Sequence, residues 1–316
     1  MNRELRIGTR GSVLAVAQAE RVAAALTRRH ADLTPVLVKI TTSGDTLVHV
    51  PLSRVGGKGL FIKEIEEALL EGAVDVAVHS MKDVPTEIAP GLTIAAILER
   101  DDPSDALISR RDKKLDALPT GARVGTSSLR RQAQLLRYRP DLLVVPLRGN
   151  LDTRLRKLRT EGLDAVVVAA AGMVRLGRQE EITEILPVEV SLPAVAQGAL
   201  GVEIRVEDGR TRDLVDPLNH QPTAVTVAAE RAFLGRVGGG CQVPIAAFAR
   251  LNGGELHLMA LVSHPDGTGM VRGERRGPSD RAEAIGIALA DELIRQGADR
   301  IVQELSERAL EPPAAP

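Results

Sequence analysis

One pattern that occurs twice limits the folds open to this chain more than any other feature. Residues 6–12 read Arg-Ile-Gly-Thr-Arg-Gly-Ser and residues 123–128 read Arg-Val-Gly-Thr-Ser-Ser, and each leads into a helical segment that contains Ala-Gln. Further along, residues 71–78 and residues 161–168 both pass from Glu-Gly into an aliphatic run. Because the two pairs follow the same order, they predict an internal duplication into two similar structural units.

Each unit alternates short aliphatic runs with amphipathic helical segments, which predicts an α/β fold with largely parallel strands. In the first unit we expect strands at residues 5–8, 36–41, 74–78 and 93–98, and helices at residues 12–29 and 61–71. In the second unit we expect strands at residues 123–125, 142–147 and 165–169, and helices at residues 128–137 and 150–160. A further strand at residues 198–204 is expected to return to the first unit. Two similar units that face each other suggest a binding cleft between them.

The pattern changes after about residue 219. We expect a helix at residues 223–234, strands at 245–251, 255–263 and 269–274, and a helical stretch at 282–308 with a possible break at Gly297. This arrangement predicts a small α+β domain at the C-terminal end. The expected division is domain 1 at residues 1–99 with 199–217, domain 2 at residues 104–193, and domain 3 at residues 218–310.

Composition narrows the classes of function. Aromatic residues make up only 1% of the chain, so its cores must be built from aliphatic side chains. Lys and Arg total 41 against 42 Asp and Glu, a balance that indicates neither nucleic acid nor a membrane surface as a partner. The single cysteine excludes an intramolecular disulfide. Six scattered histidines have no metal-binding spacing, so no metal is expected.

Two features of the sequence bear on where the chain works. The N-terminal residues are charged and lack the apolar core of a signal peptide. No apolar run approaches the roughly 18–20 residues that a membrane-spanning helix needs. We therefore expect a cytoplasmic chain.

Cationic and hydroxyl side chains gather where the first strand of each unit meets its helix. Arg10 and Ser12 occupy this turn in the first unit. The equivalent turn of the second unit carries Thr126, Ser127, Ser128, Arg130 and Arg131. A helix N-terminus offers free N–H groups and a positive dipole end, so each turn is a plausible anion site. The alternative, a helix cap with surface arginines, is weakened because the feature occurs at both duplicated positions.

Further arginines follow at strand and helix ends. Arg148 ends a strand, Arg154 lies one turn into the next helix, and Arg175 follows Gly172-Met173. Arginine suits bidentate recognition of carboxylates or phosphates, and α/β proteins place ligand contacts at strand ends. Together these arginines suggest a ligand with several carboxylates.

The segment His79-Ser80-Met81-Lys82-Asp83-Val84-Pro85 follows the buried strand of the first unit. An Asp beside a Lys in a partly closed cleft can hold its charge, stabilise a developing cation and move a proton. The alternative is a surface turn whose polar groups are satisfied locally.

A second segment, Arg54 to Phe61, contains three glycines and is basic. It lacks the spacing of a P-loop and is interpreted as a mobile flap, in which Phe61 either stacks on a flat ring or packs in the core.

Cys241 follows three consecutive glycines. A lone cysteine is usually a small buried hydrophobic residue, but the glycines remove neighbouring side chains and let a large group approach the sulfur. No histidine lies close in sequence to serve as the base of a nucleophilic thiol. A covalent anchoring role therefore fits Cys241 better than thiol catalysis.

These motifs, in this order, resemble the porphobilinogen deaminase family from about Arg6 to about Leu305. The resemblance implies an enzyme that joins four porphobilinogen molecules head-to-tail into hydroxymethylbilane and releases ammonia. It also implies two periplasmic-binding-protein-like lobes around a cleft, and one dipyrromethane cofactor held by a thioether to Cys241. Asp83 would be the acid/base residue. Relatives often show Trp at position 17 and some have Lys at position 54, where this chain has Ala17 and Arg54.

The same resemblance assigns the remaining site residues. Besides Cys241 and Asp83, those implied to hold the cofactor are Lys82, Thr126, Ser128, Arg130, Arg131 and Gln197. Those implied to bind substrate are Arg10, Ser12, Ser80, Ser127, Arg148, Arg154, Arg175 and Phe61. Porphobilinogen is the expected partner, and the chain is expected to be a monomer without nucleic acid, membrane or metal.

Two alternatives stay open on sequence grounds. The duplicated lobes also suit a non-catalytic anion-binding module of the two-lobed solute-binding type, although the missing signal peptide and the glycine-flanked Cys241 count against it. A Schiff-base enzyme that uses Lys58 or Lys82 is the other.

Overall fold

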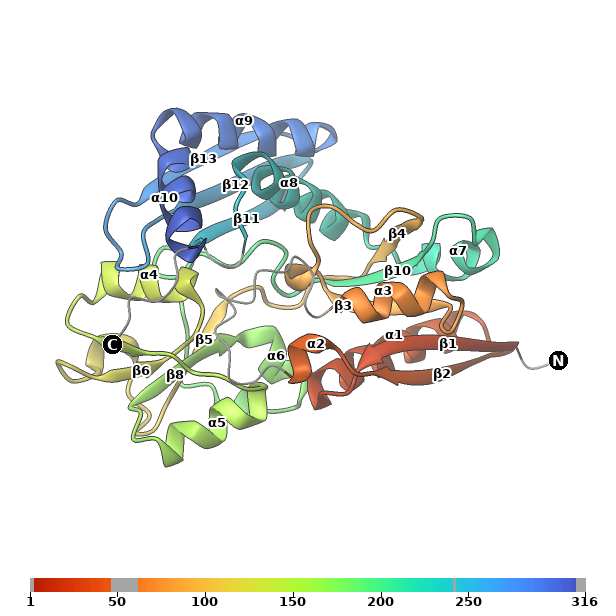
Figure 1. Cartoon of the computed structure of the whole chain (residues 1–316), viewed down its shortest axis with the longest axis horizontal. Helices are drawn as coiled ribbons and strands as arrows, with labels where there is room; N and C mark the ends of the chain where they lie inside the picture. Colours follow the sequence, from red (N-terminus) through yellow and green to blue (C-terminus); the bar gives the residue numbers. More distant parts are fainter. Residues whose placement is uncertain (1–2, 47–61, 241–242, 311–316) are drawn as a thin grey trace.

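The structure is a computed structural model that describes residues 3–46, 62–240 and 243–310. Its described part contains two five-stranded sheets and one three-stranded sheet, each covered by helices (Figure 1). The first two sheets form α/β lobes, and the third belongs to a small α+β unit near the C-terminus. The predicted fold class is therefore confirmed.

The sheet of the first lobe has the strand order β2-β1-β3-β10-β4. Its strands are β1 (Arg3–Arg10), β2 (Leu33–Ile40), β3 (Val76–Ser80), β4 (Leu92–Ile97) and β10 (Leu200–Arg205). Its helices are α1 (Val13–Arg29), α2 (Ser43–Thr46), α3 (Lys63–Leu70) and α7 (Gly209–Val215). Strand β10 runs antiparallel to both β3 and β4, so the predicted return of the chain to this lobe is confirmed.

The sheet of the second lobe has the order β7-β6-β8-β5-β9, which matches the first sheet strand for strand. Its strands are β5 (Asp105–Ser109), β6 (Arg123–Gly125), β7 (Leu143–Val145), β8 (Ala165–Ala169) and β9 (Glu184–Ile185). Its helices are α4 (Leu129–Tyr138), α5 (Leu151–Thr160) and α6 (Ala170–Arg175). Strand β5 is antiparallel to β8 and β9, as β10 is to its neighbours. The duplicated sequence is thus a duplicated topology.

Strands β5 and β9 are the main elements that the sequence pattern did not predict. Every residue of β5 is buried, including the polar Asp105 and Ser109 at its two ends. A five-residue strand with hidden polar ends lacks the alternation that marks a half-buried strand. Strand β5 follows residues 98–104, which lead from the first lobe to the second and which we call the first crossover. Strand β10 follows residues 186–199, which lead back to the first lobe and which we call the return crossover.

Helices α1, α4 and α5 begin within one residue of their predicted starts. Ser12 accepts a hydrogen bond from the backbone N–H of Ala15 at the start of α1, and Ser128 does the same for α4 from Arg131. Asn150 caps α5 in the same way. These caps satisfy N–H groups that have no partner within the helix. They also fix where each helix begins relative to the strand end before it.

The third unit pairs an antiparallel sheet with three helices. Its strands are β11 (Ile245–Asn252), β12 (Glu255–Val262) and β13 (Val271–Pro278), and its helices are α8 (Gln221–Val237), α9 (Ala282–Arg295) and α10 (Ala298–Leu310). Short 3-10 turns complete the described chain: η1 (Met81–Asp83), η2 (Leu115–Ala117), η3 (Gln179–Glu181), η4 (Asp216–Leu218) and η5 (Ser279–Arg281). Gly297, with φ of 101°, separates α9 from α10, so the predicted break is confirmed.

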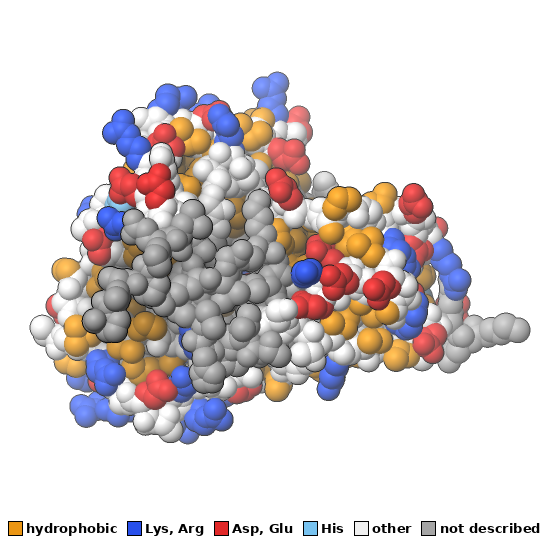
Figure 2. Space-filling view, in the orientation of Figure 1, with side chains coloured by type: hydrophobic (Ala, Val, Ile, Leu, Met, Phe, Trp, Pro, Cys, Tyr) orange, Lys and Arg blue, Asp and Glu red, His pale blue; other side chains and the backbone are white. Residues whose placement is uncertain are grey.

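The surface carries both signs of charge. Figure 2 shows basic and acidic side chains spread over the visible face of all three units, in line with a net charge of −1. In the described part of the chain, no helix is long and apolar enough to cross a membrane.

Candidate functional site

The turn after β3 presents two charged side chains to solvent. Met81, at the start of η1, is buried, whereas Lys82 and Asp83 are exposed. The Met81 side chain packs where a Cβ on Gly201 of β10 would overlap its sulfur, so glycine is required at that position. The Met81 N–H also donates to the carbonyl of Ala199 at 3.0 Å. The turn is therefore held by its buried residue while the two ionisable residues stay accessible.

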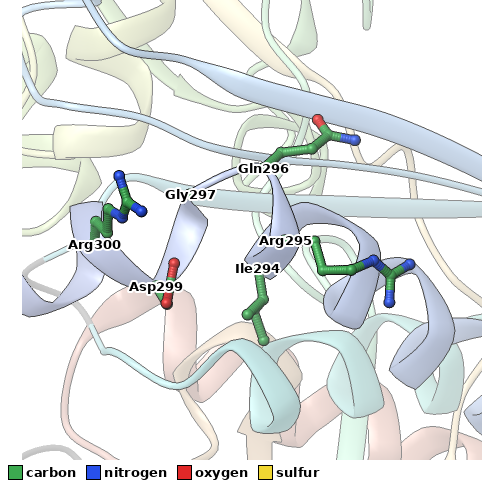
Figure 3. Close-up of a pocket in the computed structure, with 6 residues that line it drawn as sticks. All are labelled: Ile294, Arg295, Gln296, Gly297, Asp299 and Arg300. Carbon is green, nitrogen blue, oxygen red and sulfur yellow. The ribbon is translucent and has the colours of Figure 1, made fainter.

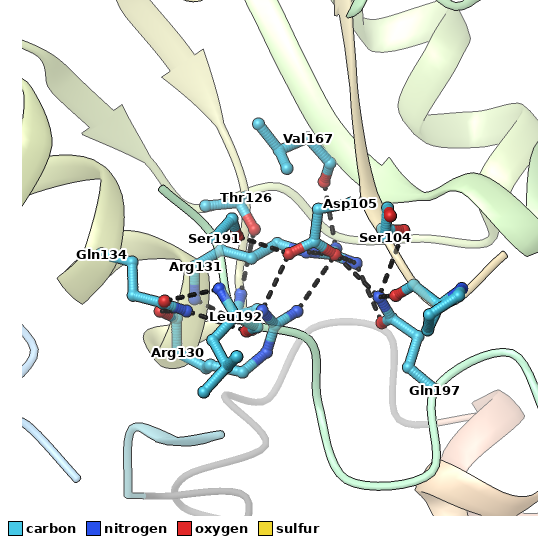
Figure 4. A network of polar contacts seen from close by, with 12 residues as sticks. Ser104, Asp105, Thr126, Arg130, Arg131, Gln134, Val167, Ser191, Leu192 and Gln197 are labelled. Carbon is cyan, nitrogen blue, oxygen red and sulfur yellow. Dashed lines mark hydrogen bonds and ion pairs between the residues drawn. The ribbon is translucent and has the colours of Figure 1, made fainter. Parts of the chain in front are cut away.

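A buried carboxylate organises the neighbouring part of the second lobe (Figure 4). Asp105, at the start of β5, is 0% exposed. It accepts hydrogen bonds from the other members of a group that we call the Asp105 cluster: Arg130 (2.8 and 3.1 Å), Arg131 (2.9 Å), Ser191 (2.7 Å) and Gln197 (2.9 Å). Burial alone would raise the pKa of Asp105. The charges of Arg130 and Arg131 outweigh it and hold that pKa far below the usual range of a carboxyl.

Arg130 and Arg131, predicted as cofactor-binding residues, both point inward in this structure. Arg130 also donates to the carbonyl of Leu192 at 2.6 Å, and Arg131 to that of Val167 at 3.1 Å (Figure 4). Burial lowers the pKa of Arg131, although Asp105 opposes this. Two guanidinium groups share one carboxylate, so the Asp105 cluster keeps a positive charge. Its contact with a ligand stays a prediction.

Gln197, on the return crossover, connects the two lobes. Its amide oxygen lies 3.4 Å from both Nζ of Lys82 and Nη2 of Arg131. Its amide nitrogen donates to Asp105 and, at 2.7 Å, to the carbonyl of Pro103 on the first crossover. A single side chain thus links the turn that carries Asp83 in the first lobe (residues 81–84, the Asp83 turn) to the Asp105 cluster of the second lobe.

Positive charges of the second lobe gather opposite the Asp83 turn. Lys82 is reached by solvent but crowded by protein atoms, and this reduced hydration lowers its pKa to about 8, with Asp83 opposing the effect. Burial likewise lowers the pKa of Arg154 to about 10, helped by the charge of Arg131 and again opposed by Asp83. Arg148 also adds to the positive potential at Arg154. The charge of Asp83 is therefore felt on both sides of the site.

Arg175, at the end of α6, is engaged with both crossovers. Its Nε donates to Asp101 at 2.8 Å and its Nη2 to the carbonyl of Gly198 at 2.5 Å. Arg21 of α1 donates to the same Asp101 carboxylate at 2.6 and 2.8 Å. Burial lowers the pKa of Arg175, and the charges of Asp101 and, more weakly, Asp83 oppose this. Arg175 was predicted to bind substrate; here it ties the lobes together beside the site.

The predicted hydroxyl residues form hydrogen bonds within the protein. Ser80 accepts from the side-chain amide of Gln18 at 3.0 Å, and Ser127 donates to the carbonyl of Leu147 at 2.8 Å. Thr126 accepts from the N–H of Ser128 at 3.2 Å. Ser12 is the α1 cap described above, and Arg10 is half-buried at the end of β1. These contacts shape the duplicated turns, and their ligand roles stay predictions.

Several predicted positions lie outside the described residues, namely Cys241, Phe61 and the flap around Arg54 and Lys58. The chain is described up to Gly240 on one side of Cys241. Gly238 and Gly239, with φ of 76° and 87°, adopt the left-handed conformation that other residues rarely take. Backbone geometry thus favours glycine at positions 238 and 239.

Sequence reasoning missed the acidic partners of these arginines. Asp105 and Asp101 stand near the first crossover, where they give no motif and where β5 was not predicted.

Two surface hollows lie away from this site. One of about 160 Å³ is lined by six residues at the α9–α10 junction, including Arg295, Asp299 and Arg300 (Figure 3). The other, of about 190 Å³, lies between β1 and α7.

Comparison with known proteins decides between the possible readings of this site. Residues 5–213 match the family model described as porphobilinogen deaminase, dipyromethane cofactor binding domain, and residues 224–295 match that of its C-terminal domain. The porphobilinogen deaminase of Geobacter sp. (strain M21) is 54% identical over 306 residues, covering 97% of this chain and 96% of that protein. The porphobilinogen deaminase of Pelobacter propionicus is 53% identical over 308 residues, covering 98% and 99%.

The chain belongs to the porphobilinogen deaminase family. It is accordingly an enzyme of tetrapyrrole biosynthesis, which polymerises porphobilinogen into hydroxymethylbilane with a dipyrromethane cofactor. The alternative of a non-catalytic binding module is thereby set aside. Among solved structures, the VFT2 domain of Bordetella pertussis BvgS aligns with a TM-score of 0.41 at 14% identity, covering 68% of this chain and 86% of that domain.

Proposed function

We propose that Asp83 is the acid/base residue of this polymerisation and that Cys241 holds the dipyrromethane cofactor through a thioether. The observation that carries the assignment of Asp83 is its position. It is an exposed carboxylate on an anchored turn, and its charge acts on Lys82, Arg154 and Arg175 together. The cations around this carboxylate also offset the repulsion that bound carboxylate ligands would exert on it.

The charges of the site suit a polycarboxylate. Porphobilinogen carries an acetate and a propionate, and each added ring brings two more carboxylates. Around the Asp83 turn, Lys82, Arg130, Arg131 and Arg154 outnumber the acids Asp83 and Asp105. The residues present therefore fit the cofactor. When bound, it supplies the fixed pyrrole end to which new units are joined.

Asp83 has two tasks in this proposal. Loss of ammonia from porphobilinogen leaves a positive charge on the substrate, and the Asp83 carboxylate stabilises that charge. The α-carbon of the terminal ring of the growing chain then attacks the methylene carbon of that cation, and once the new carbon–carbon bond has formed, the attacking α-carbon must lose its proton, which Asp83 accepts. Both tasks need a carboxylate that can reach the reacting ring, which the exposed position of Asp83 permits.

The cations divide between holding the site and binding carboxylates. Arg10, Arg148, Arg154 and Arg175 bind substrate carboxylates in this proposal, with Ser12, Ser80, Ser127 and Phe61 adding contacts. Lys82, Arg130, Arg131 and Gln197 hold the cofactor, together with Thr126 and Ser128. Each charge-assisted hydrogen bond contributes about 1.5–3 kcal/mol to binding. A substrate carboxylate at Arg175 would compete with Asp101, which binds its Nε, and with the Gly198 carbonyl, which binds its Nη2.

We further propose the division of the chain into domains at residues 1–99 with 199–217, 104–193 and 218–310. Three separate sheets, each with its own buried aliphatic residues, support it. We also propose that the enzyme works as a monomer in the cytoplasm without a metal.

The test compares Asp83→Asn with the wild type. Asp83→Asn should release ammonia from porphobilinogen about 10²–10⁴-fold more slowly, because proton transfer by the side chain is lost. The intact mass of the denatured variant should still exceed that of the bare chain by one dipyrromethane, whereas Cys241→Ser should show the bare mass. Asp280→Asn, at an exposed position of the third unit, is the matched control. Near-normal ammonia release by cofactor-loaded Asp83→Asn would refute the assignment.

A further inference from the structure

Arg231, on α8, binds the backbone that directly follows Asp83. Its Nη1 donates to the carbonyl of Val84 at 2.9 Å. Its Nη2 donates to the carbonyl of Pro85 at 2.5 Å and to that of Thr86 at 3.3 Å. One guanidinium from the third unit thus holds three consecutive carbonyls of the first lobe, beginning one residue after Asp83.

The environment of Arg231 argues against a general stabilising role. Burial lowers its pKa, and no carboxylate among the described residues offsets this effect. Withdrawing a guanidinium from water costs free energy, and an apolar residue of similar size at a buried charged position often stabilises the folded protein as well or better. An arginine bound only to carbonyl dipoles in the described structure is therefore better explained by the geometry that it imposes on those carbonyls.

The Asp83 turn is held on its other side by Met81. Met81 is buried against Gly201, and its N–H is bonded to Ala199. The N–H of Val84 closes the turn by donating to the carbonyl of Met81 at 3.3 Å. Lys82 and Asp83 lie between these two anchors. Loss of either anchor would let the carboxylate of Asp83 shift.

Helix α8, which carries Arg231, is held in place by the preceding residue, Glu230. Glu230 is 0% exposed and accepts from Arg100 at 2.6 Å, from the N–H of Ala196 at 2.6 Å and from the N–H of Ala249 at 2.8 Å. Glu230 thereby ties α8 to the return crossover and to β11. The helix then ends at Val237, four residues before Cys241.

We propose that Arg231 is a positioning residue, which sets the place of the Asp83 carboxylate relative to the chain segment that leads to Cys241. It acts through the carbonyls of residues 84–86 and does not itself contact substrate. The proposal rests on the role of Asp83 given above. Its physical basis is that misplacing a catalytic group by about 1 Å can slow a reaction about 10²-fold.

The experiment uses the cofactor-loaded enzyme with Arg231→Met and Arg231→Lys. Arg231→Met keeps the buried stem but loses all donors, and it should lower kcat for ammonia release by about 10–10²-fold while KM stays within about 2-fold. Arg231→Lys keeps the charge and some of the N–H donors, so its kcat should lie between that of the wild type and that of Arg231→Met. Arg236 lies on the same helix as Arg231 and forms an exposed ion pair with Asp291 of α9; Arg236→Met is therefore the matched control and should leave kcat unchanged.

A second measurement does not depend on activity. Amide hydrogen exchange of residues 82–88 in the cofactor-free protein should quicken in Arg231→Met and not in Arg236→Met. An unchanged kcat in folded, fully loaded Arg231→Met, together with unchanged exchange in its cofactor-free form, would overturn the proposal. If that variant does not fold, a wild-type kcat in Arg231→Lys would overturn it instead. Should Asp83→Asn keep its activity, the role of Asp83 fails, and this is read independently of the exchange result.

Discussion

The Asp105 side chain shows how one residue can bring predicted functional residues into a cluster that their motifs did not indicate. Arg130 and Arg131 stand at a duplicated anion-binding turn, and their sequence context favours a bound carboxylate. A carboxylate is indeed bound, but it comes from the chain itself. The arginines are therefore held in place before any ligand arrives, with one positive charge in excess. Preorganised charge of this kind acts on a ligand without the cost of rearranging side chains.

Removing the charge of Asp105 should destabilise the fold. Asp105→Asn leaves two buried guanidinium groups without their carboxylate, so the free energy of unfolding should fall by about 3–5 kcal/mol. Urea unfolding at neutral pH measures this difference. Asp112→Asn, at an exposed position of the same lobe, is the matched control and should change stability by less than about 0.5 kcal/mol.

The pH dependence of unfolding gives the same prediction a second readout. The folded-state pKa of Asp105 is lowered, so its contribution is complete above the unfolded pKa of about 4 and is lost as pH falls below it. Between about pH 4 and about pH 2, Asp105→Asn should therefore lose stability less steeply than the wild type. Equal slopes for the two proteins would contradict the assigned charge state.

At the scale of elements, close helix packing in the third unit depends on a single glycine. Gly286 of α9 lies against α8, where an added Cβ would overlap the carbonyl of Ala229 and approach Ala232 and Phe233. Helix α8 also carries Glu230 and Arg231, so the packing of α9 supports the contacts that α8 makes with the rest of the molecule. Gly235, on α8 itself, has ordinary space around its Cβ position.

Alanine at these two glycines should have opposite effects. Gly286→Ala should destabilise the enzyme by about 1–3 kcal/mol, because the two helices must move apart. Gly235→Ala should stabilise it by about 0.5–1 kcal/mol, because alanine loses less backbone entropy in a helix. Thermal unfolding of both variants tests this pair. A stabilising Gly286→Ala would show that the helices are not in the described contact.

At the scale of the whole molecule, the two crossovers link the lobes covalently, and side chains from both lobes meet there. Asp101 receives Arg21 from the first lobe and Arg175 from the second. Its N–H bonds the carbonyl of Gly198 at 3.1 Å, and a Cβ on Gly198 would lie 2.5 Å from the carbonyl oxygen of Asp101. The lobes are therefore joined by close backbone contact and by one shared carboxylate.

A double-mutant cycle tests whether this carboxylate couples the lobes. Asp101→Asn and Arg175→Met should each lower the free energy of unfolding, and the double variant should lose less than their sum, by about 1–3 kcal/mol. Chemical unfolding of the four proteins supplies the coupling. Arg210→Met, at an exposed position on α7, serves as the control partner and should show additive behaviour with Asp101→Asn. Additivity between Asp101 and Arg175 would contradict a direct link.

The sequence by itself determined the duplication, most elements, the break at Gly297 and the starts of the capped helices, because these depend on local periodicity and on hydrogen bonds within a few residues. It also gave the family resemblance that the comparisons confirmed. Only the tertiary structure decided that β5 joins the second sheet antiparallel to β8, that Asp105 and Asp101 pair with predicted ligand arginines, and that Arg231 holds the backbone after Asp83. The reason is physical: each of these contacts joins residues at least 25 positions apart, and no local pattern encodes the partner of a buried charge.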